Sequence, residues 1–184
     1  MERSSKRKRL VEEALSKYFL LIVLLSFLGW CFEVLLAINY TGEWVNPGAF
    51  RLPICPIYGI SLCMIYFLAG TPDEPRGILK GYHGKRRWVW YLVIAFLLPT
   101  TAELVGGSFF DRFYGVRLWD YRHLPFNVNG YISPVVSFSW MILIFLFMKY
   151  MFTPIKQFVF SAKREWRVAF FTLLLVLIGI DVFL

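Results

Sequence analysis

Two glutamates occupy the positions in this sequence that point most directly to chemistry. Glu33 and Glu103 each lie within a long run of apolar residues, five residues before its predicted end. A charged side chain near the centre of a bilayer costs at least about 2.5–3.5 kcal/mol, so such residues usually bind ions, relay protons or line a substrate path. The chemistry indicated is therefore cation binding or proton exchange. The structural alternative is that each carboxylate reaches the interface or bonds a nearby Trp, Tyr or backbone group.

The elements that position these glutamates are membrane-spanning helices. The chain has 184 residues, of which 58% are hydrophobic and only 17% charged, whereas soluble domains average about 45–50% and about 25%. With 19 Phe, 10 Tyr and 7 Trp, the chain is also too apolar to stay disordered. A span needs about 20 mostly apolar residues. We predict an all-α fold in which a basic tail over residues 1–17 precedes one transmembrane domain over residues 18–184, with five spans at 18–38, 54–70, 88–108, 131–152 and 166–184.

The distribution of Lys and Arg predicts the orientation of these spans. Basic residues accumulate on the cytoplasmic side of a membrane, and here 16 fall on one side of the predicted spans and 4 on the other. The amino terminus is therefore predicted to be cytoplasmic and the carboxyl terminus outside. Because the basic residues lie at span ends, topology explains the net charge of +8 and nucleic acid is not an expected partner. The four on the outer side are Arg51, Arg112, Arg117 and Arg122.

The two outer connections supply polar partners for the glutamates. The prolines and glycines between residues 41 and 59 predict a folded, non-helical backbone. Such a backbone lies at membrane depth only when other protein segments bury it or when it lines a water-filled cavity. A belt of interfacial aromatic residues with turn-forming amides is the alternative interpretation. We predict that ten residues line one outward-facing cleft among spans one to four and bind a small polar or cationic solute: Glu33, Asn46, Arg51, Tyr58, Glu103, Trp119, Asp120, Tyr121, Asn127 and Asn129.

The two connections also resemble each other. In each, a span with one glutamate is followed by a Trp, an Asn, a Pro and a paired Gly and Tyr that open the next span. The gap from Glu33 to Trp44 is 11 residues, and the gap from Glu103 to Trp119 is 16. A tandem two-span repeat with a fifth span added is one interpretation, since transporters often build central sites from repeats.

Several other chemistries find little support. Gly84-Lys85 is followed by Arg86, so the chain has no phosphate-binding loop and cannot itself hydrolyse nucleotides. His123 is the single outer histidine, and no nucleophile-elbow motif accompanies it. The three cysteines have no zinc-site spacing and are interpreted as packing residues, although a disulfide between Cys31 and Cys55 stays open. No cofactor and no metal site are predicted.

A family resemblance rests on several motifs: Gly29-Trp30-x-x-Glu33, Asn46, Cys55-Pro56-Ile57-Tyr58-Gly59, Glu103, Trp119-Asp120-Tyr121 and Pro125-Phe126-Asn127-x-Asn129-Gly130-Tyr131. Over about residues 20–155, the chain resembles the small multi-spanning proteins named putative ABC-transporter type IV permeases. The resemblance implies a multi-pass protein of the bacterial plasma membrane with a permease role. The expected partners are the lipid bilayer and either further copies of the chain or a separate ATP-hydrolysing subunit.

Two other function classes stay open beside membrane transport. One is a membrane-embedded enzyme that acts on a lipid-linked or extracytoplasmic substrate, with Glu or Asp as general base. The other is a small-molecule-binding sensory module, because the W-x-x-P-G run from Trp44 to Gly48 is similar to the first loop of the tryptophan-rich sensory proteins.

Overall fold

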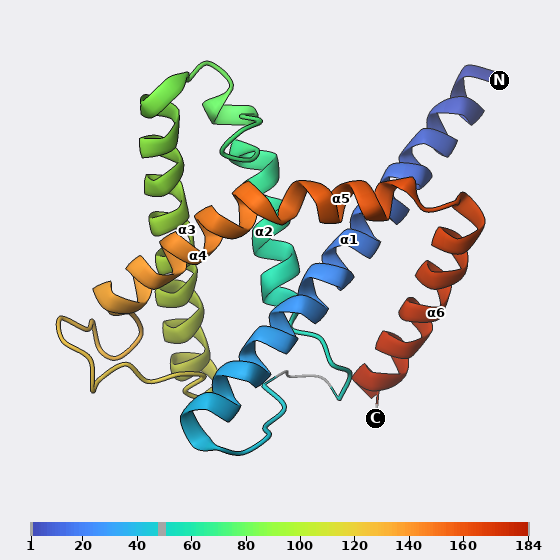
Figure 1. Cartoon of the computed structure of the whole chain (residues 1–184). Helices are drawn as coiled ribbons and strands as arrows, with labels where there is room; N and C mark the ends of the chain where they lie inside the picture. The colour runs from blue at the N-terminus through green and yellow to red at the C-terminus, as the bar shows by residue number, and fades with distance from the viewer. Residues whose placement is uncertain (1, 48–50, 184) are drawn as a thin grey trace. The chain divides into compact units, whose positions relative to one another are not determined.

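The computed structural model describes residues 2–47 and 51–183, and within them the fold is all-α, as predicted. A short 3-10 turn, η1 (Gly77–Leu79), precedes the third helix. Residues 48–50 of the predicted shaped loop lie outside the described part. Figure 1 shows the six α-helices, which are α1 (Glu2–Thr41), α2 (Pro56–Ala69), α3 (Gly84–Tyr114), α4 (Pro134–Tyr150), α5 (Phe152–Ser161) and α6 (Arg164–Phe183).

Two of these helices are long and apolar enough to cross a membrane: α1, over Arg9–Thr41, and α3. A third candidate is the pair α4 and α5, if a bend of 47° between them is part of one span. The helix α2 is apolar but has only 14 residues. The chain is therefore a membrane protein with two or three candidate spans, and the five-span arrangement stays a prediction.

The helix α5 was not predicted from the sequence, which suggested a connection between residues 152 and 166. Pro154 lies in the first turn of α5. Proline has no N–H group to continue the preceding helix, but its fixed φ angle suits the first turn of a new one. This explains why the chain bends after Met151 and then resumes a helical path.

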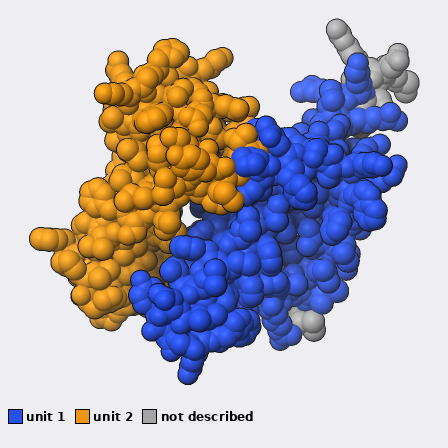
Figure 2. All heavy atoms as spheres, in the orientation of Figure 1, with its two compact units in different colours: residues 1–63, 154–184 blue, residues 64–153 orange. Residues whose placement is uncertain are grey.

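The chain forms two compact units, coloured separately in Figure 2. Unit 1 comprises residues 1–63 and 154–184, and unit 2 comprises residues 64–153. Unit 1 therefore contains α1, the first part of α2, most of α5 and α6, whereas unit 2 contains α3 and α4.

Within unit 1, α1 and α6 run parallel to each other. Arg167 near the start of α6 contacts Glu13 of α1, and Phe171 meets Phe19 with ring centroids 4.7 Å apart. Near the other end of α6, the Asp181 carboxylate accepts hydrogen bonds from the backbone N–H groups of residues 51 and 52, at 3.1 and 3.2 Å. The start of α6 is therefore held against α1, and its end is held by the loop that follows α1.

Two glycines permit the close approach of α1 and α2. A Cβ atom added to Gly29 would overlap the Tyr58 ring, and one added to Gly59 would overlap the backbone carbonyl of Ile22. Ser26 is buried at the same crossing, where its backbone oxygen accepts a hydrogen bond of 3.0 Å from the Cys55 N–H. The start of α2 is therefore held directly against the middle of α1.

Within unit 2, α3 and α4 pack antiparallel. Trp88 near the start of α3 meets Phe145 late in α4, and Phe96 meets Phe138. Tyr91 is fully buried and donates a hydrogen bond of 3.2 Å to the backbone oxygen of Gly70, just after α2. This bond ties the turn after α2 to the core of the helix pair.

The crossing of α1 and α2 predicts the effect of an added methyl group. Gly59→Ala places Cβ against backbone, which cannot move aside cheaply, so we expect the free energy of unfolding to fall by about 1–3 kcal/mol. Thermal unfolding of the purified protein in detergent measures this. Gly179→Ala in α6 is the matched control, since nothing lies within 4 Å of its added Cβ. Equal melting temperatures for the two variants would contradict the crossing.

Candidate functional site

The first predicted glutamate lies in a polar contact between α1 and α2. Glu33 is half-buried, and its carboxylate accepts a hydrogen bond from the Tyr58 hydroxyl. One turn before it, the Trp30 indole N–H donates to the side-chain oxygen of Asn46 at 2.7 Å. The Trp30 ring also meets the Trp44 ring edge-on, with centroids 6.4 Å apart. Residues from three of the sequence motifs therefore surround this end of α1.

The second glutamate has a different environment, in unit 2. The Oε1 atom of Glu103 on α3 accepts two hydrogen bonds, one from the Tyr121 hydroxyl at 3.2 Å and one from the Trp140 indole N–H of α4 at 2.9 Å. Its Oε2 atom is buried and has no hydrogen-bond partner among the described residues. A buried acceptor without a protein partner is costly, which makes this oxygen the candidate acceptor of the site.

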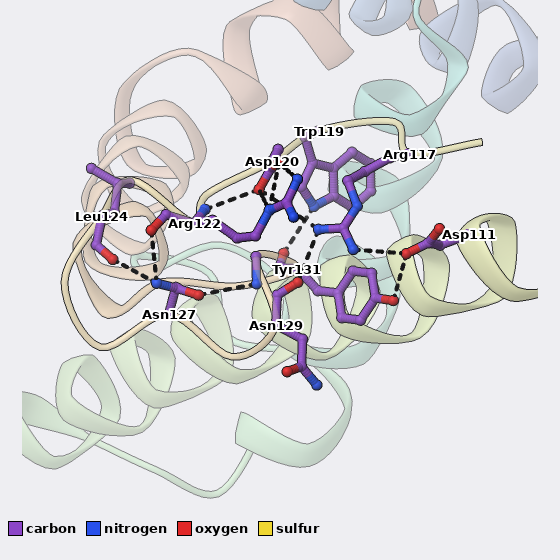
Figure 3. A network of polar contacts seen from close by, with 10 residues as sticks. Asp111, Arg117, Trp119, Asp120, Arg122, Leu124, Asn127, Asn129 and Tyr131 are labelled. Carbon is purple, nitrogen blue, oxygen red and sulfur yellow. Dashed lines mark hydrogen bonds and ion pairs between the residues drawn. The ribbon is translucent and has the colours of Figure 1, made fainter. Parts of the chain in front are cut away.

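The loop between α3 and α4 forms a polar network around Arg117 (Figure 3). The Arg117 guanidinium pairs with Asp111 at 2.9 Å and with Asp120 at 3.6 Å, and donates to the backbone oxygen of Asn129 at 3.0 Å. It also lies over the Tyr131 ring, 5.1 Å from the centroid, and the Tyr131 hydroxyl donates to Asp111 at 2.7 Å. One arginine thus joins the end of α3 to both arms of the loop.

Amide and indole groups fix the rest of this loop. The Asn127 side chain donates to the backbone oxygen of Leu124 at 2.8 Å and accepts from the Gly130 N–H at 3.1 Å. Asn129 adopts a positive φ of 52°, and in Figure 3 its side chain points away from the network. The Trp119 indole donates to the Tyr131 backbone oxygen at 2.8 Å.

A glycine of α3 provides the surface on which this loop packs. A Cβ added to Gly107 would lie 3.1 Å from the Tyr131 ring and 3.2 Å from the Trp119 ring. A Cβ added to the neighbouring Gly106 would lie 4.0 Å from the Trp119 ring, so the aromatic rings of the loop cover this part of α3. The loop therefore has a defined position over the end of α3.

Asp120 is an ion-pair partner inside the loop. Its carboxylate receives two hydrogen bonds from Arg122 Nε, at 3.0 and 2.8 Å, and one from the Arg122 backbone N–H at 3.0 Å. The Arg122 side chain and then its backbone N–H, together with the charge of Arg117, lower the pKa of Asp120 to about 2. Its charge is thus balanced by neighbours within the loop.

The structure places the predicted binding residues in two groups. Glu33, Asn46, Arg51 and Tyr58 lie in unit 1, and Glu103, Trp119, Asp120, Tyr121, Asn127 and Asn129 lie in unit 2. The prediction that both glutamates line one cleft concerns both units and stays a prediction. Within each unit, the glutamate does meet a predicted tyrosine.

Three residues that bond the predicted site residues or their segments were not predicted from the sequence. Trp140 lies in the middle of an apolar helix, where its indole N–H needs an acceptor, and that need was the available signal. Asp181 is a third carboxylate inside a predicted span, but only two were counted. Arg117 was counted only as an outer basic residue, and its pairing with Asp111 depends on how the loop folds.

The cysteines and the possible metal ligands form no further site among the described residues. All three cysteines are free thiols, so the disulfide between Cys31 and Cys55 that the sequence left open is not formed. Among the described residues, no three His, Cys, Asp or Glu side chains lie close enough together to hold a metal ion.

Apolar helices with glutamates bonded inside them define an all-α membrane protein. The chain matches a family model described as Putative ABC-transporter type IV over residues 20–184, nearly its whole length, and belongs to that family. No curated protein and no solved structure matches it. The family assignment expected from the motifs is therefore confirmed.

The loop network predicts how Asp120 titrates. Because its pKa in the folded protein, about 2, is below the ordinary value of about 3.9, the ion pair stabilises the loop above pH 4 and this contribution is lost as the pH falls through 2. The carboxyl carbon-13 shift of Asp120 should titrate near 2. In Arg122→Gln the midpoint should rise toward about 3.9. The exposed Arg112→Gln variant is the control, and an unchanged midpoint in Arg122→Gln would disprove the pairing.

Proposed function

We propose that this chain is the membrane component of an ABC-type permease and binds a small polar or cationic solute, with Glu103 as the central acceptor. The observation that carries the proposal is the buried Oε2 atom of Glu103, which has no hydrogen-bond partner within residues 2–47 and 51–183 while Oε1 accepts two hydrogen bonds. The family assignment supports the transport class.

The arrangement around Glu103 suits reversible binding. Tyr121 and Trp140 hold Oε1 and thereby fix the direction of the carboxylate. The second oxygen stays available to a cationic donor or a proton, and a solute that supplies either would remove the cost of the unsatisfied acceptor. The carboxylate lies on a candidate span, where the dielectric constant is low. A hydrogen bond between the solute and Oε2 would therefore be stronger here than in water.

Glu33 and Tyr58 form the second element of the proposed cleft. They repeat the pairing of a helix glutamate with a tyrosine hydroxyl. In the proposal the cleft faces outward from a five-span protein of the bacterial plasma membrane whose amino terminus is cytoplasmic. Since the chain has no phosphate-binding loop, a separate ATP-hydrolysing subunit supplies the energy. The further residues that we place at this cleft are Asn46, Arg51, Trp119, Asp120, Asn127 and Asn129.

Removal of the Glu103 charge tests the proposal. Glu103→Gln keeps the shape and an acceptor for Trp140, so the protein should fold with equal or slightly higher stability, since an amide is cheaper to bury than a carboxylate. Thermal-shift measurements with monovalent cations, divalent cations and protonated amines should identify a stabilising solute for the wild type. Its affinity should fall at least about tenfold, or about 1.4 kcal/mol, in Glu103→Gln.

The matched control for this experiment is Glu43→Gln, an exposed glutamate in the first outer connection. It should bind the solute as the wild type does. Equal binding by Glu103→Gln and the wild type would exclude Glu103 as the acceptor, and loss in both variants would point to a general charge effect.

The proposed orientation makes a separate prediction. A reporter fused after residue 45 should be active outside the cytoplasm, and one fused after residue 80 should be active inside, because the basic residues near position 80 stay cytoplasmic. Paired alkaline phosphatase and green fluorescent protein fusions at each position give complementary readouts. The reverse pattern would overturn the orientation and place the cleft on the cytoplasmic side.

A further inference from the structure

Unit 1 contains an apolar groove that the proposed transport site does not use. It has a volume of about 510 Å³ and is lined by α1, α5, α6 and residues 52–54. Leu24 of α1, Ala162 after α5, and Phe170 and Leu174 of α6 are among its wall residues. Nearly all of the wall is apolar, with Arg167 as the exception.

The groove has the length of one bilayer leaflet. Along α6 its lining extends from Trp166 to Ile178, a separation of 12 residues or about 18 Å at about 1.5 Å per residue. Half of the hydrocarbon core of a bilayer is about 15 Å. At the Ile178 end the groove meets residues 52–54, a segment tied to α6 through Asp181. A chain of about leaflet length therefore matches the groove between Arg167 at one end and the apolar residues 52–54 at the other.

Arg167 at the basic end is unusual in its burial and bonding. Its side chain is 5% exposed, and its Nε atom is buried without a hydrogen-bond partner among the described residues. The guanidinium donates to the backbone oxygen of Ala162 and lies 3.3 Å from Glu13. A guanidinium has five N–H donors and stays charged. The Nε–H of Arg167 is therefore a charged donor that a further acceptor could bind.

The charges around Arg167 favour an anionic acceptor. Glu13 also pairs with Lys17 at 2.7 Å, and Arg164 acts on the same carboxylate. One carboxylate thus faces three cations, which leaves this end of the groove with an excess of positive charge. Arg in particular binds phosphate through directed, charge-assisted hydrogen bonds.

We propose that this groove is a lipid-binding site, in which one acyl chain of an anionic glycerophospholipid fills the groove and its phosphate accepts from Arg167. The apolar wall selects a hydrocarbon chain, and the Nε atom of Arg167, which has no acceptor in the described part of the chain, selects the phosphate. Free phosphate would leave the apolar wall unfilled, and a neutral hydrocarbon would leave Nε without an acceptor. The site is independent of Glu103 and of the solute proposed for it.

Native mass spectrometry of the full chain released from nanodiscs tests the site. The nanodiscs contain equal amounts of phosphatidylglycerol and phosphatidylcholine. We expect the wild type to retain one phosphatidylglycerol, and Arg167→Gln to retain it at least about tenfold less. Arg86→Gln, an exposed arginine predicted on the same side of the membrane, should behave as the wild type. Wild-type retention by Arg167→Gln would overturn the proposal.

A second variant decides the question if Arg167→Gln fails to fold. Ala162→Phe leaves Arg167 and the Ala162 carbonyl in place but inserts a ring into the groove. It should lose the retained lipid, whereas Ala169→Phe, on an exposed position of α6 outside the groove, should keep it. Retention by Ala162→Phe would overturn the proposal. Millimolar inorganic phosphate should leave the lipid bound, and its displacement by phosphate alone would show an anion site that needs no acyl chain.

Discussion

The need to satisfy polar groups inside apolar helices is the constraint on which much of this structure depends. Water cannot compensate a carboxylate within a span, so each one must find donors in the protein. On the candidate spans α1 and α3, Glu33 accepts from the Tyr58 hydroxyl and Glu103 accepts from Tyr121 and Trp140. On the apolar helix α6, Asp181 likewise accepts from two backbone N–H groups. Each bond joins a helix to a segment distant in sequence, so satisfying the carboxylates also fixes the connections between helices.

The two glutamates solve this problem in related but unequal ways. Both accept a hydrogen bond from a tyrosine hydroxyl, but Tyr131, the counterpart of Tyr58 in the sequence likeness, donates to Asp111 and not to Glu103. The tyrosine that meets Glu33 lies on the next helix, whereas the tyrosine that meets Glu103 lies in a loop and is supplemented by Trp140. Of the two glutamates, Glu103 is the one with a buried carboxylate oxygen that has no hydrogen-bond partner among the described residues. The asymmetry favours Glu103 over Glu33 as the central acceptor.

The sequence predicts those features that depend on local composition. Apolar runs of sufficient length indicated α1, α3 and α4, and the motifs indicated the family. The separate helix α5 was missed because an apolar segment with an internal proline reads equally well as a connection. The partnership of Arg117 with Asp111, six residues before it in the chain, could not be predicted, since it depends on the αL turn at Gly115 and on the packing of Trp119 against Gly107.

The loop between α3 and α4 shows how a polar segment can contribute to a site by positioning another residue. Asp120 and Asp111 are both compensated by arginines, and Asn127 is bonded within its own turn, so their polar groups already have partners. The loop fixes the position of Tyr121. The backbone N–H of Tyr121 donates to the Gly130 oxygen at 2.9 Å, and its hydroxyl donates to Glu103. The loop therefore holds one oxygen of Glu103, and in our proposal the other oxygen is the one that meets the solute. A site of this kind separates the residues that position the acceptor from the acceptor itself.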